Sequence, residues 1–310
     1  MDVANPEVLP AAKRSWLFTE HGEARGYIQP HGLKELWFHT GTACNLACPF
    51  CLEGSKPGDN RLGAMRIDEV RPFIDEALEL GVEQFSFTGG EPFVVRDFIS
   101  ILAYAARHRP CLVLTNGTAP LRRRLDKIAA LREAPYPVSF RVSLDHYDPL
   151  IHDAGRGAGS FAEALQGIRE LLALGFDVSL ARQMQPGEDT DGIDARYHAL
   201  ARELGFQVPP KIVAFPEFKT PFSTADTPEI TEHCMTTYQS EAGRRDFMCA
   251  FSKMVVKRDG RLRVYACTLV DDDADYDFGG SLKEAMAVRV MLRHHRCYSC
   301  FAYGASCSER

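Results

Sequence analysis

The sequence of 310 residues lacks an apolar segment near its amino end, and no stretch of it approaches 18 apolar residues. The first absence argues against a secretory signal peptide, and the second argues against a membrane-spanning helix. We therefore expect a cytoplasmic protein with no membrane partner. In a reducing compartment, clustered cysteines favour metal binding or catalysis over disulfides.

The sequence also lacks an excess of positive charge. The formal net charge is -6, and the only dense basic run, 122–124, is typical of a solvated helix face. Neither feature indicates a nucleic-acid partner. The sequence also lacks internal repeats and low-complexity segments. Its composition, 45% hydrophobic and 25% charged, is that of an ordinary globular protein.

The middle of the chain shows a regular alternation of strand and helix patterns. Predicted strands span 35–40, 82–90, 111–117, 138–145, 176–184 and 211–218. Predicted helices span 67–81, 97–108, 121–134, 160–175 and 194–205, the fourth with Ser160 as its N-cap. This order predicts an α/β fold with parallel strands and right-handed crossovers. Because six units fall short of a closed eight-fold barrel, we expect an open, curved (β/α)6 partial barrel.

The chain is expected to divide into four parts. These are an N-terminal extension (1–34), the partial barrel (35–218), a linker (219–245) and a small cysteine-rich domain of a hairpin and helices (246–310). The linker is predicted because 219–233 is polar and contains two prolines. The hairpin is predicted at 253–267, where two apolar runs flank Asp259 and Gly260.

Three cysteines, Cys44, Cys48 and Cys51, form a C-x3-C-x2-C pattern directly after the first predicted strand. The second strand ends in Gly-Gly-Glu-Pro at 89–92, and the carboxyl ends of parallel strands form one ligand-binding edge. Soft thiolates select iron–sulfur clusters, and three thiolates on a four-iron cluster leave one iron open. A structural zinc site with a distant fourth ligand and a chance occurrence are the alternatives, which the position of the motifs disfavours.

These two motifs, in this order, resemble those of the radical S-adenosylmethionine (SAM) superfamily, and the resemblance covers about 35–218. It implies a [4Fe-4S] cluster on the three cysteines, with the open iron chelating the amino and carboxylate groups of SAM. One electron, from a flavodoxin- or ferredoxin-type partner, then cleaves the sulfonium. The resulting 5′-deoxyadenosyl radical abstracts a hydrogen atom from the substrate. The residues implied to contact SAM are Phe50, Gly89, Gly90, Glu91, Pro92, Asn116, Ser143, Asp145 and Arg182.

The resemblance also implies separate roles within that set. The two glycines are expected to let the backbone approach the methionine amino group, with Glu91 as its charge-matched acceptor. Phe50 is expected beside the adenine. Ser143 and Asp145 resemble contacts to the ribose and the carboxylate, and Arg182 is expected to pair with the methionine carboxylate.

The C-terminal part contains four cysteines in a second pattern: Cys249, Cys267, Cys297 and Cys300. Their spacing resembles the twitch extension of the same superfamily, a shortened form of the SPASM domain, and implies one auxiliary [4Fe-4S] cluster. The stretch 143–161 also resembles the subgroup with C-terminal extensions. Cys307 is an alternative ligand, and we expect no second auxiliary cluster because no further cysteine follows it. A structural zinc ion remains the alternative for this site.

Four functional hypotheses follow from these patterns. The leading one is the dehydrogenation of a small-molecule alcohol, such as a sugar or an aminocyclitol, with the auxiliary cluster as electron acceptor and Arg182 or His39 as the base. The second is an epimerase in which Cys234 or Cys307 returns a hydrogen atom. The third is modification of a ribosomal peptide, which the short extension before the first strand, with a hairpin predicted at 16–28, disfavours. The fourth is a zinc-stapled, colourless binding protein.

Overall fold

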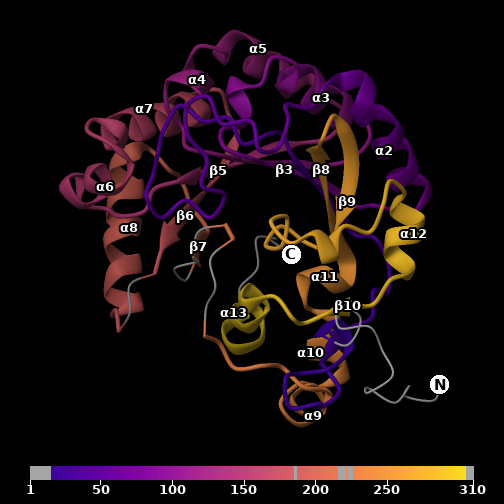
Figure 1. The fold of residues 1–310 in the computed structure, drawn as a ribbon. Coiled ribbons are helices and arrows are strands. Elements are labelled where there is room, and N and C mark those ends of the chain that lie inside the picture. Colours follow the sequence, from indigo (N-terminus) through magenta and orange to yellow (C-terminus); the bar gives the residue numbers. More distant parts are fainter. Residues whose placement is uncertain (1–14, 185–186, 216–220, 223–225, 305–310) are drawn as a thin grey trace.

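The computed structural model describes residues 15–184, 187–215, 221–222 and 226–304. Its main feature is a curved sheet of eight strands in the order β7-β6-β5-β4-β3-β2-β8-β9 (Figure 1). The strands are β2 (Glu35–His39), β3 (Gln84–Thr88), β4 (Cys111–Thr115), β5 (Val138–Ser143), β6 (Asp177–Gln183), β7 (Ile212–Phe215), β8 (Ser252–Arg258) and β9 (Arg261–Tyr265). The strands from β2 to β7 pair in parallel in chain order. The predicted open (β/α)6 partial barrel is therefore confirmed.

Helices cover the outer face of the curved sheet (Figure 1). The longer ones are α2 (Ile67–Glu79), α3 (Phe98–Ala105), α6 (Pro149–Arg156), α7 (Ser160–Ala173) and α8 (Thr190–Leu204). Strand β4, which reads Cys-Leu-Val-Leu-Thr, is almost wholly buried, as is typical of a parallel sheet covered on both faces. The carboxyl ends of the six parallel strands consequently meet at one edge of the barrel.

The helix predicted over 121–134 is broken in the structure. It consists of α4 (Ala119–Arg122), α5 (Leu125–Ala129) and a 3-10 turn (Ala130–Glu133). Arg124 leaves helical geometry between the first two pieces, and its guanidinium donates a hydrogen bond to the carbonyl oxygen of Val95 at 2.8 Å. This contact with a distant loop has no signature in the local sequence pattern.

The N-cap predicted at Ser160 is also different, because Ser160 is the first residue of α7. The cap position is Gly159, whose φ of 82° lies in the left-handed region that favours glycine. The carboxylate of Asp153, in the preceding helix, accepts hydrogen bonds from the amides of Gly159 (2.7 Å) and Phe161 (2.8 Å). The Asp153 carboxylate of α6 therefore accepts hydrogen bonds from amides at the start of α7, the role that was expected of the Ser160 side chain.

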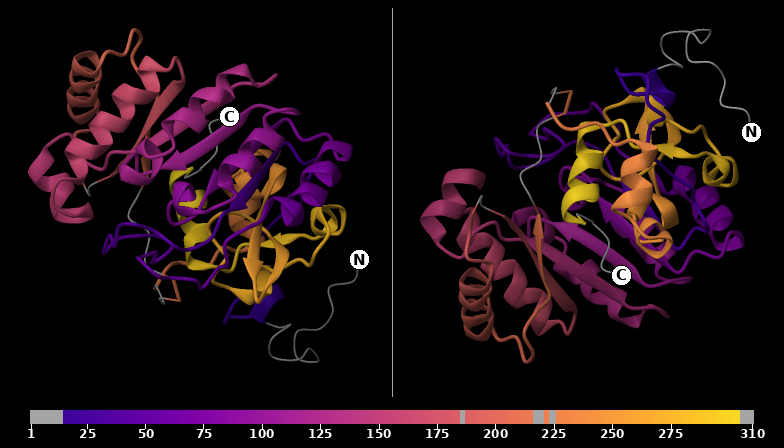
Figure 2. Two further views of the ribbon diagram at one scale, coloured as in Figure 1. Left: turned by 90° about the horizontal axis from the view of Figure 1, so that it is seen from above. Right: turned by 90° about the horizontal axis from the view of Figure 1, so that it is seen from below.

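The C-terminal part continues the barrel sheet, because β8 pairs in parallel with β2 and β9 returns antiparallel beside it. The elements around this hairpin are α11 (Met248–Phe251), a 3-10 turn (Ala274–Tyr276), α12 (Leu282–Ala287), β10 (Val290–Met291) and α13 (His295–Tyr303). The described part of the predicted linker contains α9 (Glu232–Thr237) and α10 (Glu241–Arg245), and Met235 on α9 is buried. Figure 2 shows these C-terminal elements beside the amino-terminal half of the barrel, away from α6–α8.

The amino-terminal residues pack against the C-terminal part. Strand β1 (Tyr27–Ile28) pairs antiparallel with β10, and the hairpin predicted at 16–28 is present as a bridge between Phe18 and Ala24. The Trp16 ring packs edge-on against the Tyr276 ring, with centroids 5.0 Å apart. Within the described residues, no helix is both long and apolar enough to cross a membrane.

Candidate active site

A cavity of about 230 Å³ lies at the carboxyl ends of the parallel strands. Its wall includes the three cysteines of the first motif and most of the residues expected to contact SAM. These wall residues are Cys44, Cys48, Cys51, Phe50, Gly89, Gly90, Asn116, Ser143, Asp145 and Arg182. The structure thus brings together residues from the carboxyl ends of β2 to β6 and from the loops that follow them, as the parallel topology requires.

The glycine pair fits the cysteine loop closely against the end of β3. The amide of Gly90 donates to the carbonyl oxygen of Gly41 at 2.9 Å, and the next amide donates to that of Ala43 at 3.0 Å. A Cβ atom on Gly90 would lie 2.4 Å from the Ala43 oxygen, and one on Gly89 would lie 2.6 Å from the Thr40 hydroxyl. Only glycine permits this approach, so the pair positions the loop that carries the cysteines.

Glu91 and Pro92 do not reach the cavity wall. The Glu91 carboxylate is fully buried and accepts hydrogen bonds from the Thr115 hydroxyl (2.9 Å), the Asn116 amide (2.8 Å) and the Phe93 amide (3.1 Å). Burial raises its pKa to about 7, although these hydrogen bonds act in the opposite direction. Glu91 therefore ties the end of β3 to the end of β4 and fixes the backbone of Asn116.

The thiols of the first motif are partly exposed, and burial makes two of them weaker acids than a thiol in water. Burial raises the pKa of Cys44 to about 11 and also raises that of Cys48, against which the nearby Arg156 guanidinium acts. A metal ion displaces such protons when it binds. No three His, Cys, Asp or Glu side chains of the described chain converge as ligands of a single metal ion. Three thiols on one cavity wall match the ligand number of a four-iron cluster with one open iron.

A second, smaller cavity of about 20 Å³ collects the four C-terminal cysteines. Cys249 comes from α11, Cys267 follows β9, and Cys297 and Cys300 lie three residues apart on one face of α13. Burial raises the pKa of Cys249 and of Cys297 to about 12 each. Four thiols around one cavity fit a four-thiolate cluster. Cys307, the alternative ligand, lies outside the described residues.

A family model described as the Radical SAM superfamily matches residues 38–199, more than half of the chain. The chain belongs to the radical SAM superfamily. Its cofactors accordingly include SAM and a [4Fe-4S] cluster, for which the first cysteine motif has the expected donors and surroundings.

Among the curated relatives that match part of this radical SAM enzyme are a maturase and a cyclase. The mycofactocin maturase MftC of Mycobacterium ulcerans is 37% identical over 135 residues, which are 43% of this chain and 35% of the relative. The GTP 3′,8-cyclase of Klebsiella pneumoniae is 36% identical over 140 residues, which are 43% of this chain and 41% of the relative. Each match thus spans well under half of the relative's own length.

The fold is shared with solved structures, among them SuiB and anSMEcpe. The Streptococcus suis protein SuiB, bound to its precursor peptide SuiA, aligns with a TM-score of 0.60 at 12% identity, covering 86% of this chain and 65% of that one. The protein anSMEcpe with bound AdoMet aligns with a TM-score of 0.58 at 14% identity, covering 82% and 81% of the two chains. At such identities the likeness concerns the fold alone.

Two arginines line the first cavity of this radical SAM enzyme, and sequence reasoning singled out only one. Arg182 is 1% exposed and paired with Glu188 (2.7 Å) and Asp194 (3.0 Å). Arg156, the last residue of α6, is paired with Asp145 and lies 5.8 Å above the Phe50 ring. Arg156 falls in the stretch that resembles the extended subgroup, and that resemblance was the only sequence signal for it.

Two of the predicted catalytic residues lie away from the cavity wall. His39 is fully buried, with Nε2 3.2 Å from Glu53 and with Nδ1 accepting a hydrogen bond from Gly41. Burial acts to lower the pKa of His39, but the Glu53 carboxylate raises it overall. Cys234 lies on α9, where its amide donates to the Thr231 hydroxyl. Arg182 does line the cavity. The catalytic roles of all three residues stay predictions.

Proposed function

We propose that this protein is a radical SAM maturase that modifies a peptide, with SAM bound in the first cavity and an auxiliary [4Fe-4S] cluster on the four C-terminal cysteines. The observation that carries the SAM site is the meeting of three thiols, a glycine pair and polar strand ends on one cavity wall. The peptide substrate is supported by the match to a relative named as a maturase. Neither relative reported above is named for the oxidation of an alcohol, so that hypothesis no longer leads.

The residues of the first cavity would divide the binding of SAM among them. Cys44, Cys48 and Cys51 would hold the cluster, which supplies the electron for homolytic cleavage of SAM when it is bound. The Phe50 ring would stack on the adenine of SAM. It packs closely against Gly155, where an added Cβ would lie only 2.6 Å from a ring carbon. Asn116 is oriented by its hydrogen bond to Asn45 at 3.0 Å.

Arg156 is our candidate for the SAM carboxylate in place of Arg182. Its only ion-pair partner among the described residues is Asp145, whereas Arg182 already holds two carboxylates. A guanidinium donates in a planar fork that can serve one carboxylate on each side. Asp145 would therefore orient Arg156 and leave some of its N–H groups for the ligand.

The surface of the whole cavity is more apolar than polar, and the part of its wall not assigned to SAM would face the substrate. This part includes Trp37, Leu114 and Phe215, together with Gln183 and Thr268. Such a wall suits an apolar side chain on a peptide backbone.

The proposal is tested by asking which substrate pool stimulates SAM cleavage. The anaerobically reconstituted protein is mixed with SAM, a reductant and size-fractionated extract of its source organism, and 5′-deoxyadenosine is quantified. We expect stimulation by a peptide fraction, and loss of that stimulation after the fraction is treated with protease. Stimulation by a dialysable, protease-resistant fraction would instead indicate a small molecule, the second candidate, which the match to GTP 3′,8-cyclase favours.

A further inference from the structure

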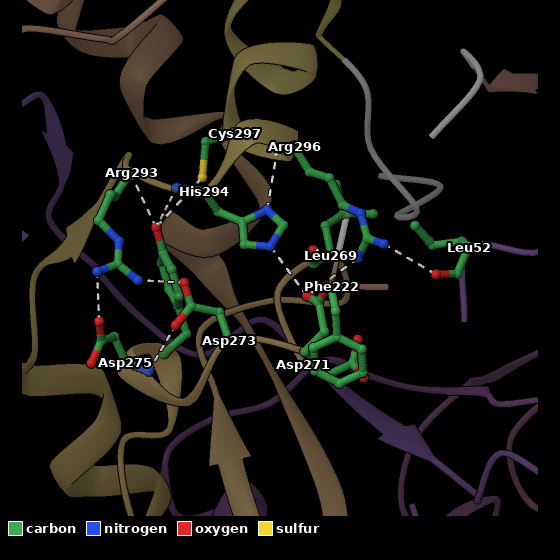
Figure 3. A network of polar contacts seen from close by, with 12 residues as sticks. Leu52, Phe222, Leu269, Asp271, Asp273, Asp275, Arg293, His294, Arg296 and Cys297 are labelled. Atoms are coloured by element: carbon green, nitrogen blue, oxygen red, sulfur yellow. Dashed lines mark hydrogen bonds and ion pairs between the residues drawn. The ribbon is translucent and has the colours of Figure 1, made fainter. Parts of the chain in front are cut away.

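Arg296 is a buried cation that contacts both cysteine-bearing parts of the protein (Figure 3). Its side chain is 1% exposed. One terminal nitrogen donates to the carbonyl oxygen of Leu52 at 3.1 Å, and the other donates to that of Leu269 at 3.0 Å. Leu52 directly follows Cys51 in the chain, and Leu269 comes two residues after Cys267. A single guanidinium thus joins the backbone segments that follow a ligand of each cysteine site.

The same side chain belongs to the second cavity itself. Arg296 lines that cavity and directly precedes Cys297 in α13. Its charge is compensated at the side by Asp272, 3.5 Å away, which also lies 3.1 Å from His294. A guanidinium fixed by two carbonyls and a buried carboxylate has little freedom to move independently of its neighbours.

A second arginine, Arg61, also connects the segment after Cys51 with the segment after Cys267. Arg61 donates to the Glu53 carboxylate at 3.0 Å and to the Asp271 carboxylate at 2.8 Å. Segments 52–53 and 269–272 are therefore joined twice, by side chains from two different parts of the chain. A displacement of one segment has to be accommodated by the other, since both links are largely removed from water.

We propose that Arg296 is a positioning residue that couples the two cysteine sites, so that filling the auxiliary site strengthens the binding of SAM at the first. This inference rests on the proposed two-cluster function. Closure of Cys267 and Cys297 around a cluster would fix the Arg296 backbone and the Leu269 carbonyl. The guanidinium would pass that constraint to Leu52 and hence to Cys51. Because coupling is reciprocal, bound SAM would stabilise the auxiliary site equally.

The test is a double-mutant cycle read by spectroscopy. Cys267→Ala, which removes an auxiliary ligand, is made in the wild-type and in the Arg296→Met background. SAM is titrated into each reduced protein, and its dissociation constant is obtained from the change in the electron paramagnetic resonance signal of the first cluster. We expect Cys267→Ala to weaken SAM binding about tenfold in the wild type, and less than about twofold when Arg296 is already replaced.

Two further variants keep the test decisive. Arg296→Lys retains the positive charge beside Asp272 but cannot span both carbonyls, so it should fold and still lose the coupling. Arg293→Met is the matched control, because Arg293 pairs with Asp273 and Asp275 in the same region and makes no contact with 52–53 among the described residues. The control should keep the tenfold effect of Cys267→Ala.

The outcomes separate the inference from the function on which it rests. If Cys267→Ala leaves SAM affinity unchanged, or if its full effect persists in both Arg296 variants, the coupling role is overturned while the two-cluster enzyme stands. If the wild-type protein has no reducible cluster at the first site, the proposed function fails and the inference fails with it.

Discussion

Replacement of Cys48 by alanine is expected to abolish the cleavage of SAM. The thiol of Cys48 is one of three on the wall of the first cavity, and two thiolates do not hold a cluster with one open iron. After anaerobic reconstitution, the variant should lose the iron and sulfide of one cluster and keep those of the auxiliary site. Formation of 5′-deoxyadenosine should fall to the level of a protein-free control.

Cys111→Ala is the matched control for this experiment. Cys111 is a buried thiol on β4 that lies on neither cavity wall, and burial raises its pKa above the normal range. Its replacement removes only a small buried group, which should cost about 1 kcal/mol of stability, and iron content should not change. A Cys48→Ala protein with wild-type iron and wild-type turnover would contradict the assigned ligand set.

Replacement of Gly90 by alanine is expected to have the next largest effect. The new Cβ would lie 2.4 Å from the Ala43 carbonyl oxygen and 2.6 Å from that of Thr42, and neither backbone atom can rotate away. The cysteine loop would have to move from the end of β3. We expect the free energy of unfolding of the cluster-free protein to fall by about 1–3 kcal/mol, and reconstitution of the first cluster to fail.

Urea unfolding and iron analysis measure these two effects separately. Gly280→Ala is the control, because Gly280 is exposed and a Cβ there would meet nothing within 4 Å. It should leave both quantities unchanged. Normal loading of the first cluster in Gly90→Ala would show that the loop does not need the close approach, and would remove the structural role given to the glycine pair.

Much of the barrel could be predicted from the sequence, because its strands and most of its helices follow local patterns. Strand and helix signals alternate regularly, and the helices over 67–81, 97–108, 160–175 and 194–205 appear close to their predicted positions. The position of β8 beside β2 could not be predicted, since that pairing joins residues more than 200 positions apart. The sheet therefore extends across the boundary that was expected to separate barrel and C-terminal domain.

The residues of the candidate site also divide into those that the sequence could predict and those that it could not. The cysteines and the glycine pair were found because their spacing within one loop is itself a signal. Arg61 and Arg296 were missed, because their partners lie up to 210 and 244 positions away in the sequence. Glu91 was expected to face the methionine amino group, but its carboxylate satisfies backbone and hydroxyl donors around Asn116 instead. Hydrogen bonds between residues that are distant in the sequence leave no pattern in the local sequence from which they could be predicted.

That SAM binds to the open iron of a cluster on the first cysteine motif is tested most directly by electron paramagnetic resonance. The spectrum of the anaerobically reduced protein is recorded before and after addition of SAM. We expect a brown protein whose first-cluster signal changes when SAM binds to the open iron, followed by the appearance of 5′-deoxyadenosine. A fully iron-loaded protein whose spectrum is indifferent to SAM, or a colourless protein that binds only zinc, would contradict this expectation.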